Sequence, residues 1–379
     1  MVHAHATHIL LVSEQAAPNL LPTLDPSLRA SQAKLIVTGK MQRRGEQLQR
    51  VLREAGVISE IILIEKEHDP VCLDHAFLDV AASIEGPVAL NLTGGTKLMA
   101  LRALNVANAA GWWSFYVDVD TDHVIPLDKS PPRQLDTSLR LTHYLGAYGF
   151  QREAQPTPPR LDAAADDLLQ TLVVQCNVLQ EPLAKLNWLA QQAEDGRALV
   201  VRLDNVHLHD AALNRLVDQF AEAGMLERHG DQLRFIDAAR LAFVKGGWLE
   251  RHVFRQVANV SDALAIRDKA ANLNVVDSDG LRNELDVAFI ARNRLFVIEC
   301  KTARMDGGRQ GPPRANDTLF KLSGICRRVG GLGARGMLVS YRALRNSEQD
   351  LAKALGIDVV AGGEIARLGA RIRRWVRPV

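Results

Sequence analysis

The chain has 379 residues, of which 47% are hydrophobic and 24% charged, and a formal net charge of +2. This length exceeds what one hydrophobic core usually supports, so we expect two or three domains, and the composition excludes wholesale disorder. No apolar run reaches the roughly 20 residues that cross a bilayer, and the first residues lack the basic start of a signal peptide, so we expect no membrane partner. Four scattered cysteines without paired spacing favour neither zinc nor disulfides and indicate a cytoplasmic location.

The N-terminal part alternates continuous apolar runs with amphipathic stretches, which is typical of a doubly wound, mostly parallel sheet. The expected strands cover residues 7–14, 33–40, 60–65, 87–95, 112–119 and 122–127, and the expected helices cover 41–55, 72–85 and 96–110. Ligands of such sheets bind beyond the carboxyl ends of the strands. This places the turns Ser13–Glu14, Thr38–Gly39 and Thr93–Lys97 on one common rim.

One of these turns has the composition of an anion site. In NLTGGTKLMALRA (91–103), Thr93, Gly94, Gly95 and Thr96 lie between an expected strand and an expected helix, and Lys97 follows them. Backbone N–H groups at a helix N-terminus, with hydroxyls and a lysine beside them, favour a bound anion. A tight packing turn explains the same string equally well, because it is neither a P-loop nor a G-x-G-x-x-G motif.

The Pro-rich segment 155–160 indicates a linker, and a smaller unit follows it. Expected helices at 161–176, 181–193 and 210–224, followed by a hairpin that turns at Gly230–Asp231, form the pattern of a winged helix. The third helix carries more acidic than basic residues, which suits a phosphate-lined groove poorly. We therefore favour a connecting or dimerising role for this unit over contact with nucleic acid.

A second α/β domain is expected from residue 238 onward. It begins with a helix interrupted at Gly246–Gly247. The expected strands that follow cover 284–291, 294–300, 336–341 and 357–360, and the expected helices cover 316–329, 347–355 and 363–375. The domains predicted from these changes of pattern are 1–155, 156–237 and 238–379.

The segment NELDVAFIARNRLFVIECKTA (283–303) concentrates charge on two apolar strands. Alternate residues of a strand lie on one face, so Glu284 and Asp286 share a face of the first strand. Glu299 and Lys301 likewise share a face of the second, and folding the hairpin can bring the two sets together. Converging carboxylates suit Mg²⁺ or Mn²⁺, and a lysine beside them can stabilise negative charge on a phosphoryl oxygen. The chemistry that needs these parts is phosphodiester hydrolysis.

The residues after this hairpin are basic, with ten Lys or Arg and two Asp between residues 301 and 345. Local positive charge beside a candidate site indicates a polyanionic substrate, although a solvated basic surface is an equal alternative. Lys321 on the next expected helix is a candidate contact to nucleic acid or, alternatively, a simple surface lysine.

Asp286 followed thirteen residues later by Glu299-Cys300-Lys301 resembles the PD-(D/E)XK nuclease pattern. The chain departs from it at Leu285, where the pattern has proline. The resemblance implies a restriction-endonuclease-like fold, with a metal held by Asp286, Glu299 and the backbone carbonyl of Cys300. It also implies a supporting Glu250 on the preceding helix. Cys300, in the variable position of the pattern, is expected to point its side chain into the core.

TGGTKLM (93–99) and LLVSEQAAPNLLPTL (10–24) resemble CARF domains, the Rossmann-like sensors of cyclic oligoadenylates in type III CRISPR immunity. With the C-terminal motifs, nearly the whole chain resembles the Card/Can ancillary nucleases. That resemblance implies a homodimer, a cyclic tetra-adenylate activator and cleavage of DNA, RNA or both. It implies ligand contacts from Ser13, Glu14, Gln15, Asn19, Thr38, Gly39, Thr93, Gly94, Gly95, Thr96, Lys97 and Met99.

Two other functions are compatible with the sequence. The first is a ligand-responsive transcription regulator that binds DNA through the winged-helix unit and carries an inactive nuclease fold. The intact Asp286, Glu299 and Lys301 argue against it, because an abandoned site has no need of costly buried charge. The second is a ring nuclease, in which the N-terminal domain degrades its own activator.

Overall fold

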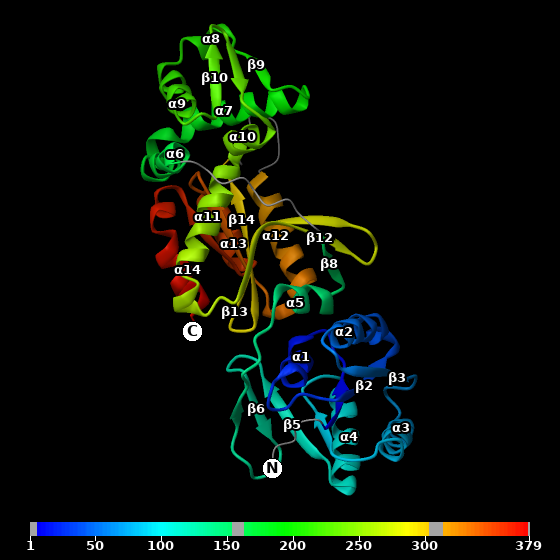
Figure 1. Ribbon diagram of the computed structural model, residues 1–379. Helices are drawn as coiled ribbons and strands as arrows, with labels where there is room; N and C mark the ends of the chain where they lie inside the picture. The colour runs from blue at the N-terminus through cyan, green and yellow to red at the C-terminus, as the bar shows by residue number, and fades with distance from the viewer. Residues whose placement is uncertain (1–5, 154–162, 303–313, 378–379) are drawn as a thin grey trace.

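A computed structural model describes residues 6–153, 163–302 and 314–377. Its three parts follow one another along the molecule, with the N-terminal domain at one end, the C-terminal domain in the middle and the connecting unit at the other end (Figure 1). The connecting unit thus does not lie between the domains that flank it in the sequence, because the chain passes the C-terminal domain to reach it.

The N-terminal domain is built on a seven-stranded sheet of order β3-β2-β1-β4-β5-β6-β7. Its strands are β1 (Thr7–Leu11), β2 (Gln32–Thr38), β3 (Ile58–Ile64), β4 (Val88–Asn91), β5 (Trp113–Asp118), β6 (His123–Pro126) and β7 (Arg133–Gln134). The first five pair in parallel, and β6 and β7 are antiparallel additions. This is the doubly wound arrangement that the apolar runs predict, so the expectation of an α/β fold is confirmed.

Helices cover both faces of this sheet, as its two separate buried clusters show. They are α1 (Ala17–Leu24), α2 (Gln42–Glu54), α3 (Pro70–Ala82), α4 (Lys97–Ala110) and α5 (Leu141–Ala147), with the short η1 (Gly39–Met41). The sequence did not predict α1, because Pro18 lies in its first turn and Pro22 lies inside it.

The connecting unit consists of four helices and a three-stranded sheet of order β10-β11-β9. Its elements are α6 (Ala163–Val174), α7 (Cys176–Asp195), β9 (Val200–Arg202), α8 (Asn205–Leu208), α9 (Ala211–Glu222), β10 (Leu226–His229) and β11 (Gln232–Phe235). The hairpin of β10 and β11 turns at the predicted place, and β9 is an additional strand that the sequence analysis did not foresee.

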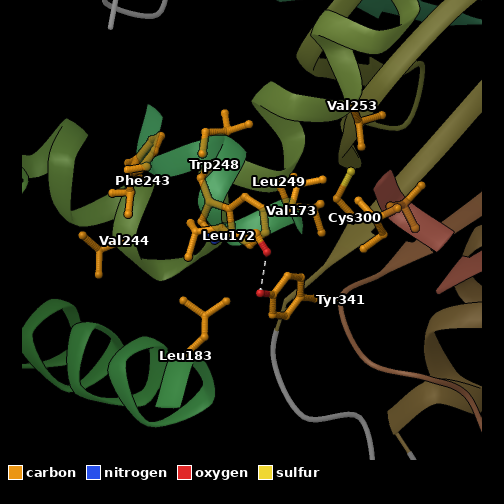
Figure 2. Close-up of a cluster of buried hydrophobic side chains, with 14 of the residues drawn as sticks. Leu172, Val173, Leu183, Phe243, Val244, Trp248, Leu249, Val253, Cys300 and Tyr341 are labelled. Atoms are coloured by element: carbon orange, nitrogen blue, oxygen red, sulfur yellow. Dashed lines mark hydrogen bonds between the residues drawn. The ribbon is translucent and has the colours of Figure 1, made fainter. Parts of the chain in front are cut away.

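The connecting unit shares one continuous core with the C-terminal domain. Trp248 packs edge-on against Tyr341 with ring centroids 5.2 Å apart, and the Tyr341 hydroxyl donates to the Leu172 carbonyl at 2.8 Å. Figure 2 shows these residues with Leu183 and Val244 in the same cluster. The unit is therefore packed firmly against the C-terminal domain.

The C-terminal domain contains a six-stranded sheet of order β16-β15-β14-β13-β12-β8. The strands are β8 (Phe150–Arg152), β12 (Asp268–Asp277), β13 (Arg282–Ala291), β14 (Arg294–Lys301), β15 (Arg335–Ser340) and β16 (Ile357–Ala361). The helical elements are α10 (Ala238–Ala242), the π-helical η2 (Phe243–Gly247), α11 (Trp248–Asn259), η3 (Asp262–Leu264), α12 (Arg314–Gly330), η4 (Gly331–Gly333), α13 (Asn346–Ala354), η5 (Gly362–Arg367) and α14 (Leu368–Val376).

Two strands of this sheet differ from the sequence analysis. β12 was not predicted, because its buried residues Ala270, Leu273 and Val275 do not keep a simple alternation. β8 falls inside the range 1–155 predicted for the N-terminal domain, yet it pairs antiparallel with β12. The chain thus enters the C-terminal sheet before it reaches the connecting unit.

Polar contacts join the N-terminal and C-terminal domains. Asn293, in the turn between β13 and β14, accepts from the Leu139 N–H at 2.8 Å and donates to the Thr137 carbonyl at 2.9 Å. Arg43 donates to Asp279 at 2.7 Å. These bonds supplement the covalent connection and fix how the two domains meet.

All four cysteines are free thiols, and three of them are buried. Among the residues that the structure describes, no helix is both long and apolar enough to cross a membrane.

Candidate active site and ligand-binding rim

The paired strands β13 and β14 separate where the charged residues lie. Their antiparallel register begins at Val287↔Ile298, although β13 starts at Arg282 and β14 continues to Lys301. β14 also pairs in parallel with β15 from Phe296 to Lys301, and over Glu299–Lys301 only this second pairing continues. The divergence opens a gap between the two arms of the hairpin at the height of the predicted catalytic residues.

Asp286, Glu299 and Lys301 meet at this gap. The Lys301 Nζ lies 2.7 Å from Glu299 Oε1, and the Cys300 N–H donates to Asp286 Oδ2 at 2.7 Å. The Asp286 carboxylate thus bridges the separated strands and replaces a ladder hydrogen bond. The alternation of strand side chains correctly predicts this convergence.

Burial and mutual charge make this group electrostatically unusual. Burial and, next in size, the charge of Glu299 raise the pKa of Asp286 to about 8, although Lys301 opposes the rise. Burial lowers the pKa of Lys301, but Glu299 and Asp286 outweigh that effect and leave it above its ordinary value. The site therefore holds a protonated ammonium beside a carboxyl group whose ionised form is disfavoured, and such strongly perturbed groups are typical of a functional site.

Glu250 reaches the same site from the first turn of α11. Burial raises the pKa of Glu250, a hydrogen bond from Asn272 opposes the rise, and the charge of Glu284 adds to it. Asn272 Nδ2 donates to Glu250 Oε2 at 2.9 Å. Glu284 itself is exposed near the start of β13, so its negative charge acts on Glu250 from the edge of the site. The sequence analysis missed Asn272, since it lies on the strand that was not predicted.

The donor set fits a hard divalent cation. Asp286 and Glu299 offer carboxylate oxygens, and burial together with the charge of Glu299 raises the pKa of Asp286, an effect that a bound cation would reverse. Within the described residues, no group of three or more His, Cys, Asp or Glu side chains is arranged to hold a metal. The Cys300 carbonyl is the further oxygen that the sequence pattern names.

Cys300 and Lys321 occupy contrasting places. The Cys300 side chain is buried in the core shared with Leu249 and Val253, and burial raises its pKa well above the ordinary value (Figure 2). The prediction that it points into the core is confirmed.

Lys321 is exposed on α12, where its contact with nucleic acid stays a prediction. Part of the basic segment after Lys301, residues 303–313, lies outside the described residues.

The turn after β4 is built by glycine and held against β1. A Cβ at Gly94 would overlap the carbonyl oxygen of Leu11, and Gly95 has φ of 69° in the left-handed region. Thr96 caps α4 by accepting from the Met99 N–H at 3.2 Å. The turn therefore presents free N–H groups of a 14-residue helix at the sheet edge, as an anion site requires.

A buried network of asparagines supports this turn. Asn91 Oδ1 accepts from the Thr93 hydroxyl at 2.7 Å, and Asn91 Nδ2 donates to Asn19 Oδ1 at 3.0 Å. Asn19 Nδ2 in turn donates to the Leu11 carbonyl at 3.0 Å. Asn19 is 1% exposed and Met99 0% exposed, so their side chains lie beneath the rim and support it. Their contact with a ligand stays a prediction.

The remaining predicted ligand residues lie on the common rim with different exposure. Glu14, Gly39 and Lys97 are exposed, Ser13 and Gln15 are partly buried, and Thr38 is buried. The Thr93 hydroxyl accepts from the Val117 N–H at 2.7 Å, so it is committed to the sheet. Lys97 is consequently the side chain of this turn that is best placed to meet an anion.

The loop after β1 also contacts the segment that leads into β8. The Tyr148 hydroxyl lies 3.4 Å from Gln15 Oε1 and accepts from the Ala16 N–H at 3.4 Å. The Arg44 guanidinium stacks 4.5 Å over the Tyr148 ring and lies 3.5 Å from Glu14. Because β8 belongs to the C-terminal sheet, the Tyr148 side chain forms one of the contacts between the rim and the C-terminal domain.

Two parts of the chain match models of known protein families. The sequence matches the Card1 CARF domain over residues 7–144 and the Card1-like endonuclease domain over residues 237–379. The fold and the site thus define a protein with a CARF domain and an endonuclease domain. The chain belongs to the family that joins a Card1 CARF domain to a Card1-like endonuclease domain. No curated protein sequence matches it.

Solved structures resemble nearly the whole chain. Protein VC1899 from Vibrio cholerae is 26% identical over 98% of both chains, with a TM-score of 0.87. Can2 from Sulfobacillus thermosulfidooxidans, solved with cyclic tetra-adenylate, is 22% identical over 98% of this chain and 97% of its own, with a TM-score of 0.79. A type III CRISPR defence DNA nuclease activated by cyclic oligoadenylate is 20% identical over 89% of this chain and 45% of its own, with a TM-score of 0.55. The last two likenesses concern the fold.

Proposed function

We propose that the chain is a metal-dependent nuclease of type III CRISPR defence, activated in the cytoplasm by a cyclic oligoadenylate and cleaving DNA, RNA or both. The observation that carries the proposal is the meeting of Asp286, Glu299 and Lys301 at the gap between β13 and β14. Buried, incompletely neutralised carboxylates are costly unless they bind a cation. The endonuclease family match supports the same chemistry.

Asp286, Glu299 and the Cys300 carbonyl would hold Mg²⁺ or Mn²⁺, which supplies Lewis-acid activation of a phosphodiester and of water. Lys301 keeps its proton, because the neighbouring carboxylates hold its pKa above the ordinary value. It therefore acts as a fixed positive charge toward negative charge that develops on a phosphoryl oxygen. Glu250 and Glu284 add negative potential that favours a cation in the site.

The proposed activator is cyclic tetra-adenylate, bound at the rim by the N-terminal N–H groups of α4 and by Lys97. A symmetric ring presents identical phosphates to two copies of one turn, so a homodimer is its matching receptor. The contact of Tyr148 with Gln15 offers a physical route by which an occupied rim would influence the nuclease sheet. Activation requires that the ligand bind two conformations with different affinity.

A cleavage panel tests this proposal. The full-length protein is incubated with single-stranded and duplex DNA and RNA, with Mg²⁺, Mn²⁺ or EDTA, and with or without cyclic tetra-adenylate. We expect cleavage that needs both the metal and the ring. Equal cleavage with and without the ring would contradict activation, and cleavage in EDTA would contradict the metal.

The same panel separates the two alternatives. A transcription regulator would bind a specific promoter fragment and cleave no nucleic acid under any of these conditions. A ring nuclease would consume the cyclic tetra-adenylate, and chromatography of the reaction mixture would show linear products. Either outcome can be read without changing the protein.

A further inference from the structure

A backbone irregularity lies in β12 directly opposite Asp286. β12 pairs with β13 in one constant register, and the pairs at Ala271 and Leu273 are kept. The position between them, Asn272 opposite Asp286, makes no pair, and Asn272 has φ of 51°. The left-handed region is uncommon for a residue with a Cβ, and asparagine is among the few that tolerate it.

This irregularity aims the amide of Asn272 at the active site. Asn272 Nδ2 donates to Glu250 Oε2 at 2.9 Å, and Glu250 is the residue that α11 brings to the hairpin. On either side of the kink, Ala270 and Leu273 enter the same buried cluster although they are three positions apart, an odd spacing that would place them on opposite faces of a regular strand. The kink thus removes Asn272 from the regular alternation and frees its side chain to reach across to the helix.

A purely structural role explains Asn272 poorly. The residue is exposed, so it adds little to the packing of the sheet. If the chain needed only a left-handed backbone at this point, glycine would adopt it without a side-chain penalty. An unusual backbone conformation beside a candidate site supports a functional hypothesis. Because glycine lacks the side-chain amide, that amide is the group whose function the hypothesis has to explain.

We infer that Asn272 is a positioning residue for Glu250, an inference that rests on the proposed nuclease function. By holding Oε2, the amide fixes the rotation of the carboxylate and directs Oε1 toward the site. The hydrogen bond also favours the charged carboxylate against the effect of burial on its pKa. Asn272 itself has no part in the chemical step.

The test compares three variants of the full-length protein in the cleavage assay. Asn272→Gly is compatible with the left-handed backbone and removes the side chain with its amide. We expect its cleavage rate to fall roughly tenfold to a hundredfold, the scale of one hydrogen bond to a charged group. Asn272→Asp keeps the shape and places a like charge against Glu250, so we expect a larger loss. Ala265→Gly is the matched control, since Ala265 is exposed and has φ of 52° outside the site. It should retain the wild-type rate within about twofold.

A double-mutant cycle with Glu250→Ala separates positioning from a general structural effect. If Asn272 acts through Glu250, Asn272→Gly should change the residual rate less than about twofold in the Glu250→Ala background. Effects that multiply in the double variant would overturn the inference, as would an Asn272→Gly enzyme with the wild-type rate. If Asn272→Gly fails to fold, the isosteric Asn272→Asp is carried through the same cycle.

The same cycle read in melting temperature reports the contact without catalysis. Loss of the hydrogen bond should make the two substitutions non-additive in the metal-free protein, and additive shifts would overturn the contact. A wild type that cleaves nothing under any condition would overturn the proposed function and the positioning role together. An active wild type with additive rate effects would overturn the positioning role alone.

Discussion

The two candidate sites use the ends of strands in opposite ways. At the nuclease hairpin, the groups that matter are charged side chains, and burial and mutual repulsion shift the pKa of Asp286 to about 8. At the CARF rim, the groups that matter are backbone N–H groups, and most side chains around them are committed to internal hydrogen bonds. The hairpin is thus defined by unfavourable electrostatics, whereas the rim is defined by a backbone conformation that internal hydrogen bonds hold in place.

The difference follows from what each site has to do. A catalytic site gains from a polarised environment that is costly until a cation and a substrate enter it. A sensing site gains from a fixed surface, because ordering it at the moment of binding would reduce the affinity. The hairpin should therefore respond most strongly to pH and charge, and the rim to volume and backbone freedom.

The largest effect that sharpens this contrast is the dependence of stability on pH. The folded protein keeps the Asp286 proton up to about pH 8, whereas the unfolded chain loses it near pH 4. Between these values the unfolded state binds fewer protons, so the free energy of unfolding falls as pH rises, by up to about 1.4 kcal/mol per pH unit. Denaturation of the metal-free protein across this window measures the slope. Asp286→Asn should reduce it, and an unchanged slope in that variant would contradict the assignment.

Next in size is the loss of Lys301. We expect Lys301→Ala to reduce the rate of activated cleavage at least about a hundredfold, the scale of removing one electrostatic stabiliser from a transition state. Lys321→Ala is the matched control, because Lys321 is exposed on α12 at a distance in sequence from the hairpin. It should change the rate only a few-fold. Comparable losses in the two variants would mean that the rate depends on the total positive charge near the site and not on the position of Lys301.

At the rim, volume should matter more than charge. Gly94→Ala places a methyl group against the Leu11 carbonyl, so the turn has to shift, and we expect a loss of about 1–3 kcal/mol in stability together with weaker binding of cyclic tetra-adenylate. Gly39→Ala on the same rim has open space around its Cβ, so its free energy of unfolding should stay within about 0.5 kcal/mol of the wild type. Thermal unfolding and calorimetric titration measure both. Equal behaviour of the two variants would contradict a sterically fixed turn.

The smallest expected effect is that of Lys97→Ala. Lys97 is exposed, so its attraction to a phosphate is worth about 1 kcal/mol or less, which is roughly a fivefold loss of affinity for cyclic tetra-adenylate. The loss should shrink at high salt, because screening weakens exposed charge pairs, and the melting temperature should not change. Titration at low and high salt measures it. A loss that is independent of salt would assign Lys97 a structural role instead.

The sequence predicts elements well where one physical signal dominates. Continuous apolar runs locate the five parallel strands of the CARF domain, and alternation locates the convergence of Asp286 with Glu299. It fails where two signals conflict. α1 contains two prolines, and β12 contains a left-handed asparagine that breaks its alternation.

The site residues show the same limit. Resemblance assigns Asn19 and Met99 to the ligand by position, but position does not reveal that both side chains are buried. Asn272 carries no local signal at all, because its importance arises only from the pairing of β12 with β13 and from the place of α11. Contacts between elements that are distant in sequence are set by packing, which periodicity along the chain does not encode.

The place of β8 decides how this protein can be divided for experiments. A fragment that ends at residue 155 removes Phe150–Arg152 from the endonuclease half, where that short strand covers the edge of β12. The uncovered edge would expose unpaired N–H and carbonyl groups, which act as a template for aggregation. Expression of the endonuclease half alone should therefore start upstream of Phe150. An insoluble fragment that starts later would reflect this missing strand rather than any intrinsic instability of the catalytic fold.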